Sequence, residues 1–80
     1  RASNPKASGE NQIGAPLQGR LARIFVKAGE KVKRNAPLFT IEAMKMETTI
    51  TATKDLTIKR LALNEATMVE SEDLVIEIEG

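Results

Sequence analysis

The sequence contains no histidine, cysteine, tyrosine or tryptophan. The chain therefore lacks the commonest general base, the thiol nucleophile and most of the side chains that bind transition metals. Catalysis would have to come from Asp, Glu, Lys, Ser or Thr, and the 11 carboxylates are scattered as on any solvated surface. We therefore expect no catalytic residue, no metal site and no enzyme activity of the chain by itself. Without cysteine, no disulfide can stabilise the domain, and the redox compartment stays open.

An excess of one charge and long apolar runs are missing as well. The formal net charge is +1, which gives no electrostatic footprint for nucleic acid or an anionic membrane. No apolar run approaches the roughly 18 residues of a membrane span, and no signal-peptide pattern is present. With 80 residues, 41% hydrophobic and 29% charged, the chain is one small globular domain. It begins at Arg1, so we expect a piece of a longer protein.

The composition changes after the first dozen residues. Residues 1–12, RASNPKASGENQ, show no apolar periodicity and mix Ser, Asn, Pro, Gly and charged residues. This composition predicts a flexible linker, with the folded domain over residues 13–80. From there, short β-rich segments alternate with turn residues, which predicts an all-β barrel or sandwich. The β-rich segments lie at 13–15, 21–26, 38–41, 48–53, 57–63, 68–69 and 74–78.

The two halves of the folded region repeat each other. When the sequence is shifted by 37 residues, ten positions agree in register, mostly with apolar side chains. Each half alone would expose its apolar face, so we expect two equivalent β-units that pack face to face. The alternative is the general self-similarity of chains made of short strands. The matching pairs are Ile13/Ile50, Ala15/Ala52, Leu21/Ile58, Ile24/Leu61, Val26/Leu63, Val32/Val69, Leu38/Val75, Phe39/Ile76, Ile41/Ile78 and Glu42/Glu79.

The segment that joins the halves has an unusual composition for a turn. The repeat places Met44, Lys45 and Met46 at the tip of a hairpin. Tight hairpin turns of the favoured types need positive φ, which Gly and Asn adopt more easily than Met and Lys. We expect a cost of about 1 kcal/mol or more per strained residue, so the side chains are predicted to be needed for function. They would present an exposed amine for acylation by a partner enzyme, between two adaptable thioethers. The spacing alone equally allows an ordinary surface lysine whose neighbouring methionines fold back onto the core.

The sequence from Ala43 to Glu47, AMKME, resembles the biotin attachment motif of the biotinyl, or biotin carboxyl carrier, domain of biotin-dependent carboxylases. The resemblance covers nearly all of residues 13–80. Residues 26–32 are similar to the family's strand-turn-strand signature. Residues 14–19 are similar to its segment of alanine, proline, methionine and glycine, with departures at Leu17 and Gln18.

The resemblance implies a flattened antiparallel barrel or sandwich of two four-stranded sheets with quasi-twofold symmetry. The modified lysine would sit on a hairpin at one end, with both termini at the other. It also implies that a biotin protein ligase attaches biotin covalently to Lys45. A biotin carboxylase domain would load this biotin with a carboxyl group, which the carrier would take to a carboxyltransferase domain. Ala43, Met44 and Met46 match the residues around the family's modified lysine, and Glu47 belongs to the motif without a separate role. The implied location is the cytoplasm, or the mitochondrial matrix in a eukaryote.

Residues 42–50 are most similar to the C-terminal carrier domains of pyruvate carboxylases, whose product is oxaloacetate. The connection from Lys27 to Leu38 is too short for the protruding insertion of the bacterial acetyl-CoA carboxylase carrier. Other carriers without this insertion, such as those of propionyl- or methylcrotonyl-CoA carboxylase and of sodium-pumping decarboxylases, stay open.

Two departures from the family pattern concern turns. Leu56 stands where the second half usually has Gly, and Ala66 replaces the Gly that matches Gly29. If the backbone needs positive φ at these positions, Leu56 and Ala66 carry strain there. We expect instead that the local turns differ, for example with Asn64 or Asp55 in the left-handed conformation.

Two other functions compete with that of a biotin carrier. A lipoyl carrier also presents a lysine on a hairpin between two halves, but its lysine is typically preceded by Asp. An unmodified β-barrel adaptor would treat Lys45 as an ordinary surface residue.

Overall fold

The structure is a computed structural model that describes residues 6, 7, 9 and 11–79. These residues form strands and turns and no helix, so no described helix is available to cross a membrane. The strands are β1 (Gln12–Gly14), β2 (Gly19–Ile24), β3 (Lys31–Val32), β4 (Pro37–Ala43), β5 (Met46–Thr51), β6 (Leu56–Leu61), β7 (Met68–Val69) and β8 (Leu74–Ile78).

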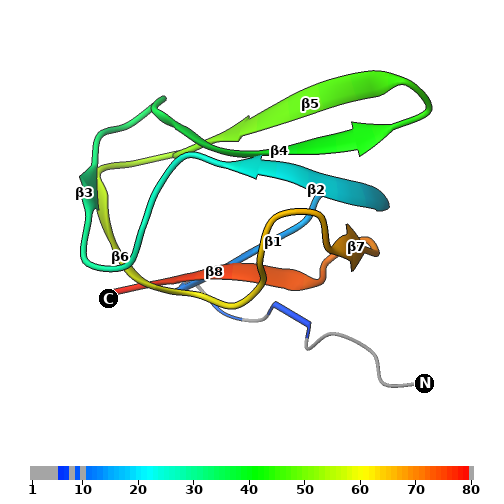
Figure 1. Cartoon of the computed structure of the whole chain (residues 1–80). Coiled ribbons are helices and arrows are strands. Elements are labelled where there is room, and N and C mark those ends of the chain that lie inside the picture. Colours follow the sequence, from blue (N-terminus) through cyan, green and yellow to red (C-terminus); the bar gives the residue numbers. More distant parts are fainter. Residues whose placement is uncertain (1–5, 8, 10, 80) are drawn as a thin grey trace.

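The eight strands form two antiparallel sheets of four strands each (Figure 1). One sheet has the order β1-β8-β6-β3 and the other β5-β4-β2-β7. The molecule measures 30 × 26 × 17 Å along its principal axes, which is a flattened shape. The predicted fold class, a flattened all-β sandwich of two four-stranded sheets, is therefore confirmed.

The internal repeat is a structural repeat. A shift of 37 residues carries β2 onto β6 and β3 onto β7, and it turns one sheet order into the other. Hydrogen bonds between loops and strands repeat as well. Gly29 N donates to Ile58 O at 2.7 Å, and the equivalent Ala66 N donates to Leu21 O at 2.7 Å. The quasi-twofold symmetry therefore extends from the order of the strands to individual backbone contacts.

The core lies between the two sheets, where the apolar residues of both halves meet. Every apolar pair that agrees in the repeat is either buried in this core or packed against it. Burial of this shared surface is the main stabilising term, because either sheet alone would leave its apolar face in water. The largest side chains that are fully buried are Phe39, Leu21, Leu38, Ile41, Ile58, Ile76, Val69 and Val75.

The turn geometry corrects one expectation. Ala66 itself has φ 72°, in the left-handed region, and neither Asn64 nor Asp55 is in that region. The reason is the repeat: Ala66 is equivalent to Gly29, whose φ is 87°. The two residues donate equivalent backbone hydrogen bonds and adopt the same backbone conformation. Leu56 has no positive φ and begins β6, where it pairs with Val32 of β3.

The described chain ends lie at different places. Figure 1 shows the C-terminal end of β8 on the side of the molecule opposite the β4–β5 hairpin tip. Gln12 at the start of β1 pairs with Glu77 in the last part of β8. Lys6, by contrast, forms an isolated bridge with Asp73, which immediately precedes β8. Residues in the stretch expected to be a linker therefore contact the barrel.

Candidate functional site

The predicted hairpin tip is a two-residue turn between β4 and β5. Ala43 pairs with Met46 across the hairpin, which leaves Met44 and Lys45 as the two central residues of the turn. Their φ angles are 52° and 68°, and positive φ at both central residues is the signature of a type I′ turn. This turn matches the twist of the flanking strands, and Met44 and Lys45 adopt it at a cost that Gly or Asn would lower. The predicted strained residues are therefore Met44 and Lys45, and Met46 begins β5.

All three side chains of the Met-Lys-Met unit are exposed. Met44 is 94% exposed and Met46 is 71% exposed, so neither folds back onto the core. Lys45 is also exposed, and its amine has no hydrogen bond or ion pair with any described residue. Of the two interpretations that the spacing left open, the geometry favours an amine and two thioethers presented to a partner.

The base of the hairpin is held by residues that sequence reasoning did not single out. Gly19 in β2 passes so close to the end of β4 that a Cβ there would lie 2.6 Å from Glu42 O and 3.1 Å from the Ala43 Cβ. The Nε and a terminal nitrogen of Arg20 donate to Glu42 Oε1 at 3.2 and 2.7 Å. Ala43 is half-buried in this contact, so it supports the turn and does not present a side chain.

The ion pair of Arg20 has an electrostatic task. Glu42 and Glu47 are direct cross-strand partners, and like charges in such positions destabilise a sheet. Arg20 pairs with Glu42 from the neighbouring strand and offsets this repulsion next to the turn. Both partners are about half exposed, so the contribution to stability is small, about 0–1 kcal/mol. The sequence signal for this contact is weak, because it joins residues 22 positions apart.

Other features of the described surface lie apart from the hairpin tip. No three acidic side chains among the described residues are grouped so that they could hold a metal ion. Shallow pockets lie between β3 and β6, lined by residues such as Lys31 and Thr57, and beside Gln12 and Glu77. Neither of these pockets includes a residue of the hairpin tip.

Comparison with known protein families agrees with this geometry. The family model described as "Biotin-requiring enzyme" matches residues 11–78, which include both sheets. The chain belongs to this family: it is a biotinyl carrier domain of biotin-dependent carboxylases, and the family's cofactor is biotin.

Two curated relatives with similar sequences are pyruvate carboxylases. The chain is 47% identical over 77 residues to the pyruvate carboxylase of Staphylococcus aureus, an alignment that covers 94% of the chain and 7% of that enzyme. It is 41% identical over 78 residues to the mitochondrial pyruvate carboxylase of Mus musculus, covering 95% of the chain and 7% of that enzyme. The chain thus spans about 7% of the length of these relatives.

A solved structure supports the fold. The lipoyl domain of the 2-oxoglutarate dehydrogenase complex from Azotobacter vinelandii superposes with a TM-score of 0.77 at 28% sequence identity. The match covers 89% of this chain and 98% of that domain. The same two-sheet architecture therefore serves in a domain with a different prosthetic group.

Proposed function

We propose that Nζ of Lys45 is the atom to which a biotin protein ligase attaches biotin. The observation that carries this proposal is the position of Lys45: an exposed amine at a two-residue turn, in a chain of a biotin-requiring family. The amine is a primary amine that can form an amide, and no described group occupies it or covers it. The residues present therefore fit covalently bound biotin.

The hairpin and the side chain have separate tasks. A two-residue turn on paired strands fixes the Cα of Lys45 relative to the barrel, because no further loop residues are free to move. The four-carbon side chain of lysine then supplies the flexibility. Amide formation removes the charge of the amine, and bound biotin would supply a ring nitrogen that accepts and gives up a carboxyl group. Met44 and Met46 present soft apolar surface that can adapt to more than one partner.

The partners follow from the carrier role. The domain would receive the carboxyl group at a biotin carboxylase domain and deliver it at a carboxyltransferase domain of the same parent enzyme. The similarity to two pyruvate carboxylases supports pyruvate as the acceptor and oxaloacetate as the product. The domain itself contributes no catalytic residue; a tether within residues 1–12 would keep it close to both sites.

The carrier role is tested in the parent carboxylase with Lys45→Arg. This variant keeps the charge at an exposed position, so the free energy of unfolding should change by less than about 0.5 kcal/mol. Carboxylation of pyruvate should be lost, while each half-reaction measured with free biotin should stay at the wild-type rate. Lys54→Arg, at another exposed turn, is the matched control and should retain full activity. Retained pyruvate carboxylation in Lys45→Arg would refute the carrier role.

A lipoyl carrier is the second candidate, because the lipoyl domain from Azotobacter vinelandii has the same fold at 28% identity. The residues at the tip favour biotin. Lys45 is preceded by Met44 and followed by Met46, whereas Asp typically precedes the lysine of lipoyl domains. Incubation with a lipoyl ligase in place of a biotin ligase discriminates between the two, and a lipoyl group on Lys45 would favour the second candidate.

A further inference from the structure

The repeat gives an internal control for every position. A residue that both halves need for the fold should have a similar counterpart 37 positions away. A residue that serves only one half should break the symmetry. Two such departures meet at one place on the surface: Asp73 stands where the first half has Ala36, and Gly14 stands where the second half has Thr51. Both contact the N-terminal segment at Lys6 and Ala7.

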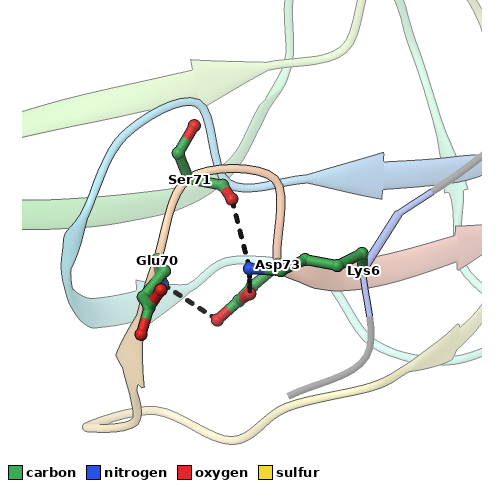
Figure 2. Close-up of polar contacts among 4 residues, drawn as sticks. All are labelled: Lys6, Glu70, Ser71 and Asp73. Atoms are coloured by element: carbon green, nitrogen blue, oxygen red, sulfur yellow. Dashed lines mark hydrogen bonds and ion pairs between the residues drawn. The ribbon is translucent and has the colours of Figure 1, made fainter. Parts of the chain in front are cut away.

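Asp73 receives the side chain of Lys6 (Figure 2). Its side chain is only 4% exposed, and Oδ1 accepts a hydrogen bond from Lys6 Nζ at 2.5 Å. Oδ2 accepts the backbone N–H of Glu70 at 2.9 Å, which fixes the carboxylate within the turn between β7 and β8. Lys6 Nζ also lies 3.5 Å from Ser71 O. A carboxylate this buried is costly unless it is paired, and Lys6 and the N–H of Glu70 are among its partners, whereas the equivalent Ala36 in the first half carries no charge that needs pairing.

The backbone of the segment is bound at the same turn. Ala7 N donates to Glu72 O at 2.8 Å, next to the bridge between Lys6 and Asp73. Ala7 also packs against Gly14, where an added Cβ would come within 2.9 Å of the Ala7 Cβ, 3.1 Å of Glu72 O and 3.3 Å of Asp73 O. A side chain at position 14 would therefore displace Ala7 and press on the backbone of the β7–β8 turn. Its counterpart Thr51 carries a side chain and is exposed.

We propose that the β7–β8 turn and Gly14 form a binding site for the chain's own N-terminal segment. In this site Asp73 forms an ion pair with Lys6, and Gly14 leaves space for the side chain of Ala7. A chain that enters this site leaves the barrel at Lys6, beside the start of β8. Without the site it would leave at the start of β1, beside the C-terminal part of β8. The site thus decides from which end of the molecule the preceding chain departs.

For a carrier domain, this site sets the reach of the tether, a consequence that rests on the proposed function. Release of Lys6 and Ala7 would lengthen an extended tether by at most about 20 Å, since six residues separate the start of the segment at Lys6 from β1 and each spans roughly 3.3–3.6 Å. Figure 1 shows β7 and the start of β8 on the same side of the molecule as the β4–β5 hairpin. Binding of the segment therefore shortens the tether and moves its origin toward the hairpin.

The charges around the site support the contact. The hydrogen bond to Asp73 raises the pKa of Lys6 above the ordinary 10.5; desolvation, the second-largest effect, opposes this shift, and the charges of Asp73, Glu70 and Glu72 raise the pKa further. Lys6 is charged throughout the neutral range, as any lysine is, and the direction of its pKa shift agrees with the contact with Asp73.

Amide hydrogen exchange of the whole 80-residue chain tests the site, with Lys6→Gln as the main variant. Lys6 is 53% exposed, and in this variant Asp73 keeps the hydrogen bond from Glu70 N, so we expect the effect to be confined to the β7–β8 turn and the N-terminal segment. In the wild type, we expect the Ala7 amide to exchange at least about tenfold more slowly than in an unstructured peptide. Lys6→Gln should remove most of this protection, and Lys6→Arg should restore it. The amides of Ile13 and Ile76, which pair between β1 and β8, should be unchanged in all variants.

Two further variants separate the site from a general effect of charge. Lys33→Gln removes an exposed lysine that lies 3.9 Å from Asp55, far in sequence from the site, and should leave Ala7 protected. Gly14→Thr copies the other half of the repeat and should release Ala7 as Lys6→Gln does. An unprotected Ala7 in the wild type, or equal protection in Lys6→Gln and wild type, would overturn the proposal. No readout involves biotin, so failure of biotinylation at Lys45 and failure of this site are distinguishable.

Discussion

Gly29 and Ala66 occupy equivalent places in the two halves, with φ of 87° and 72° and matching hydrogen bonds. An added Cβ at Gly29 would meet no atom within 4 Å, and Ala66 is exposed. Exchanging the two residue types therefore changes the backbone preference and almost nothing else. We predict that Ala66→Gly stabilises the domain and that Gly29→Ala destabilises it.

The size of both effects follows from two opposing terms. An L-residue in the left-handed region costs about 1–2 kcal/mol. Glycine offsets part of its advantage there, because it loses about 0.4–1 kcal/mol more conformational entropy on folding. The net change is about 1 kcal/mol in the free energy of unfolding, upward for Ala66→Gly and downward for Gly29→Ala. The residues share no hydrogen-bond partner, so the double variant should match the wild type within about 0.5 kcal/mol.

Equilibrium unfolding in urea measures these changes. The midpoint should move in opposite directions for the two single variants, while the slope m stays constant, because the surface exposed on unfolding is unchanged. A lower midpoint for Ala66→Gly, or an unchanged midpoint for Gly29→Ala, would show that the two positions are not under the same backbone constraint and would refute the reasoning.

Further predictions concern the core, the turn and the N-terminal contact. Phe39→Ala should lower the free energy of unfolding by about 3–5 kcal/mol, because Phe39 is fully buried. Phe25→Ala is the control: Phe25 is 44% exposed, so the free energy of unfolding should fall by well under half as much. Urea unfolding measures both changes. Thr40→Val should raise the free energy of unfolding by about 1 kcal/mol, because the buried hydroxyl of Thr40 has no hydrogen-bond partner among the described residues; a decrease in thermal stability would contradict this. Met44→Asn should raise the free energy of unfolding by about 0.5–1 kcal/mol, because Asn tolerates φ near 52° and the exposed Met44 side chain makes no packing contact that would be lost. If Met44 contacts the ligase, this variant should also be biotinylated more slowly, as measured by avidin blot. The contact of Lys6 should be present from neutral pH up to 10.5 and lost as the pH rises through the raised pKa of Lys6. NMR titration of the Lys6 amine should show a higher midpoint in the wild type than in Asp73→Asn.

The sequence predicts the architecture well, because the core positions of both halves require apolar residues and the repeat places these residues at the same intervals. Leu21 and Ile58, or Phe39 and Ile76, are equivalent because both sheets must fill one shared core, and that demand fixes residue type at each position. The repeat also predicts the hairpin tip, which lies where the two halves join. The preference of two-residue hairpins for positive φ predicts the left-handed backbone of Met44 and Lys45.

Contacts without a local pattern were not predictable. The left-handed conformation of Ala66 opposes the intrinsic preference of alanine; in the sequence only the match to Gly29 points to it, and in the structure it accompanies a hydrogen bond to Leu21, 45 positions earlier. The pairing of Lys6 with Asp73 joins residues 67 positions apart, and its segment looks like a linker because it has no apolar periodicity. In each case a tertiary hydrogen bond outweighs local preference, and a single chain's sequence does not record which groups will meet.

The central claim is that the hairpin amine of Lys45 is the site of biotin attachment. Intact mass spectrometry of the whole chain, after incubation with a biotin protein ligase, ATP and biotin, tests it most directly. The account predicts one biotinyl group per wild-type chain, located at Lys45 by peptide mapping, and none on Lys45→Arg. An unmodified wild-type chain, or a biotinyl group on any other lysine, would contradict it.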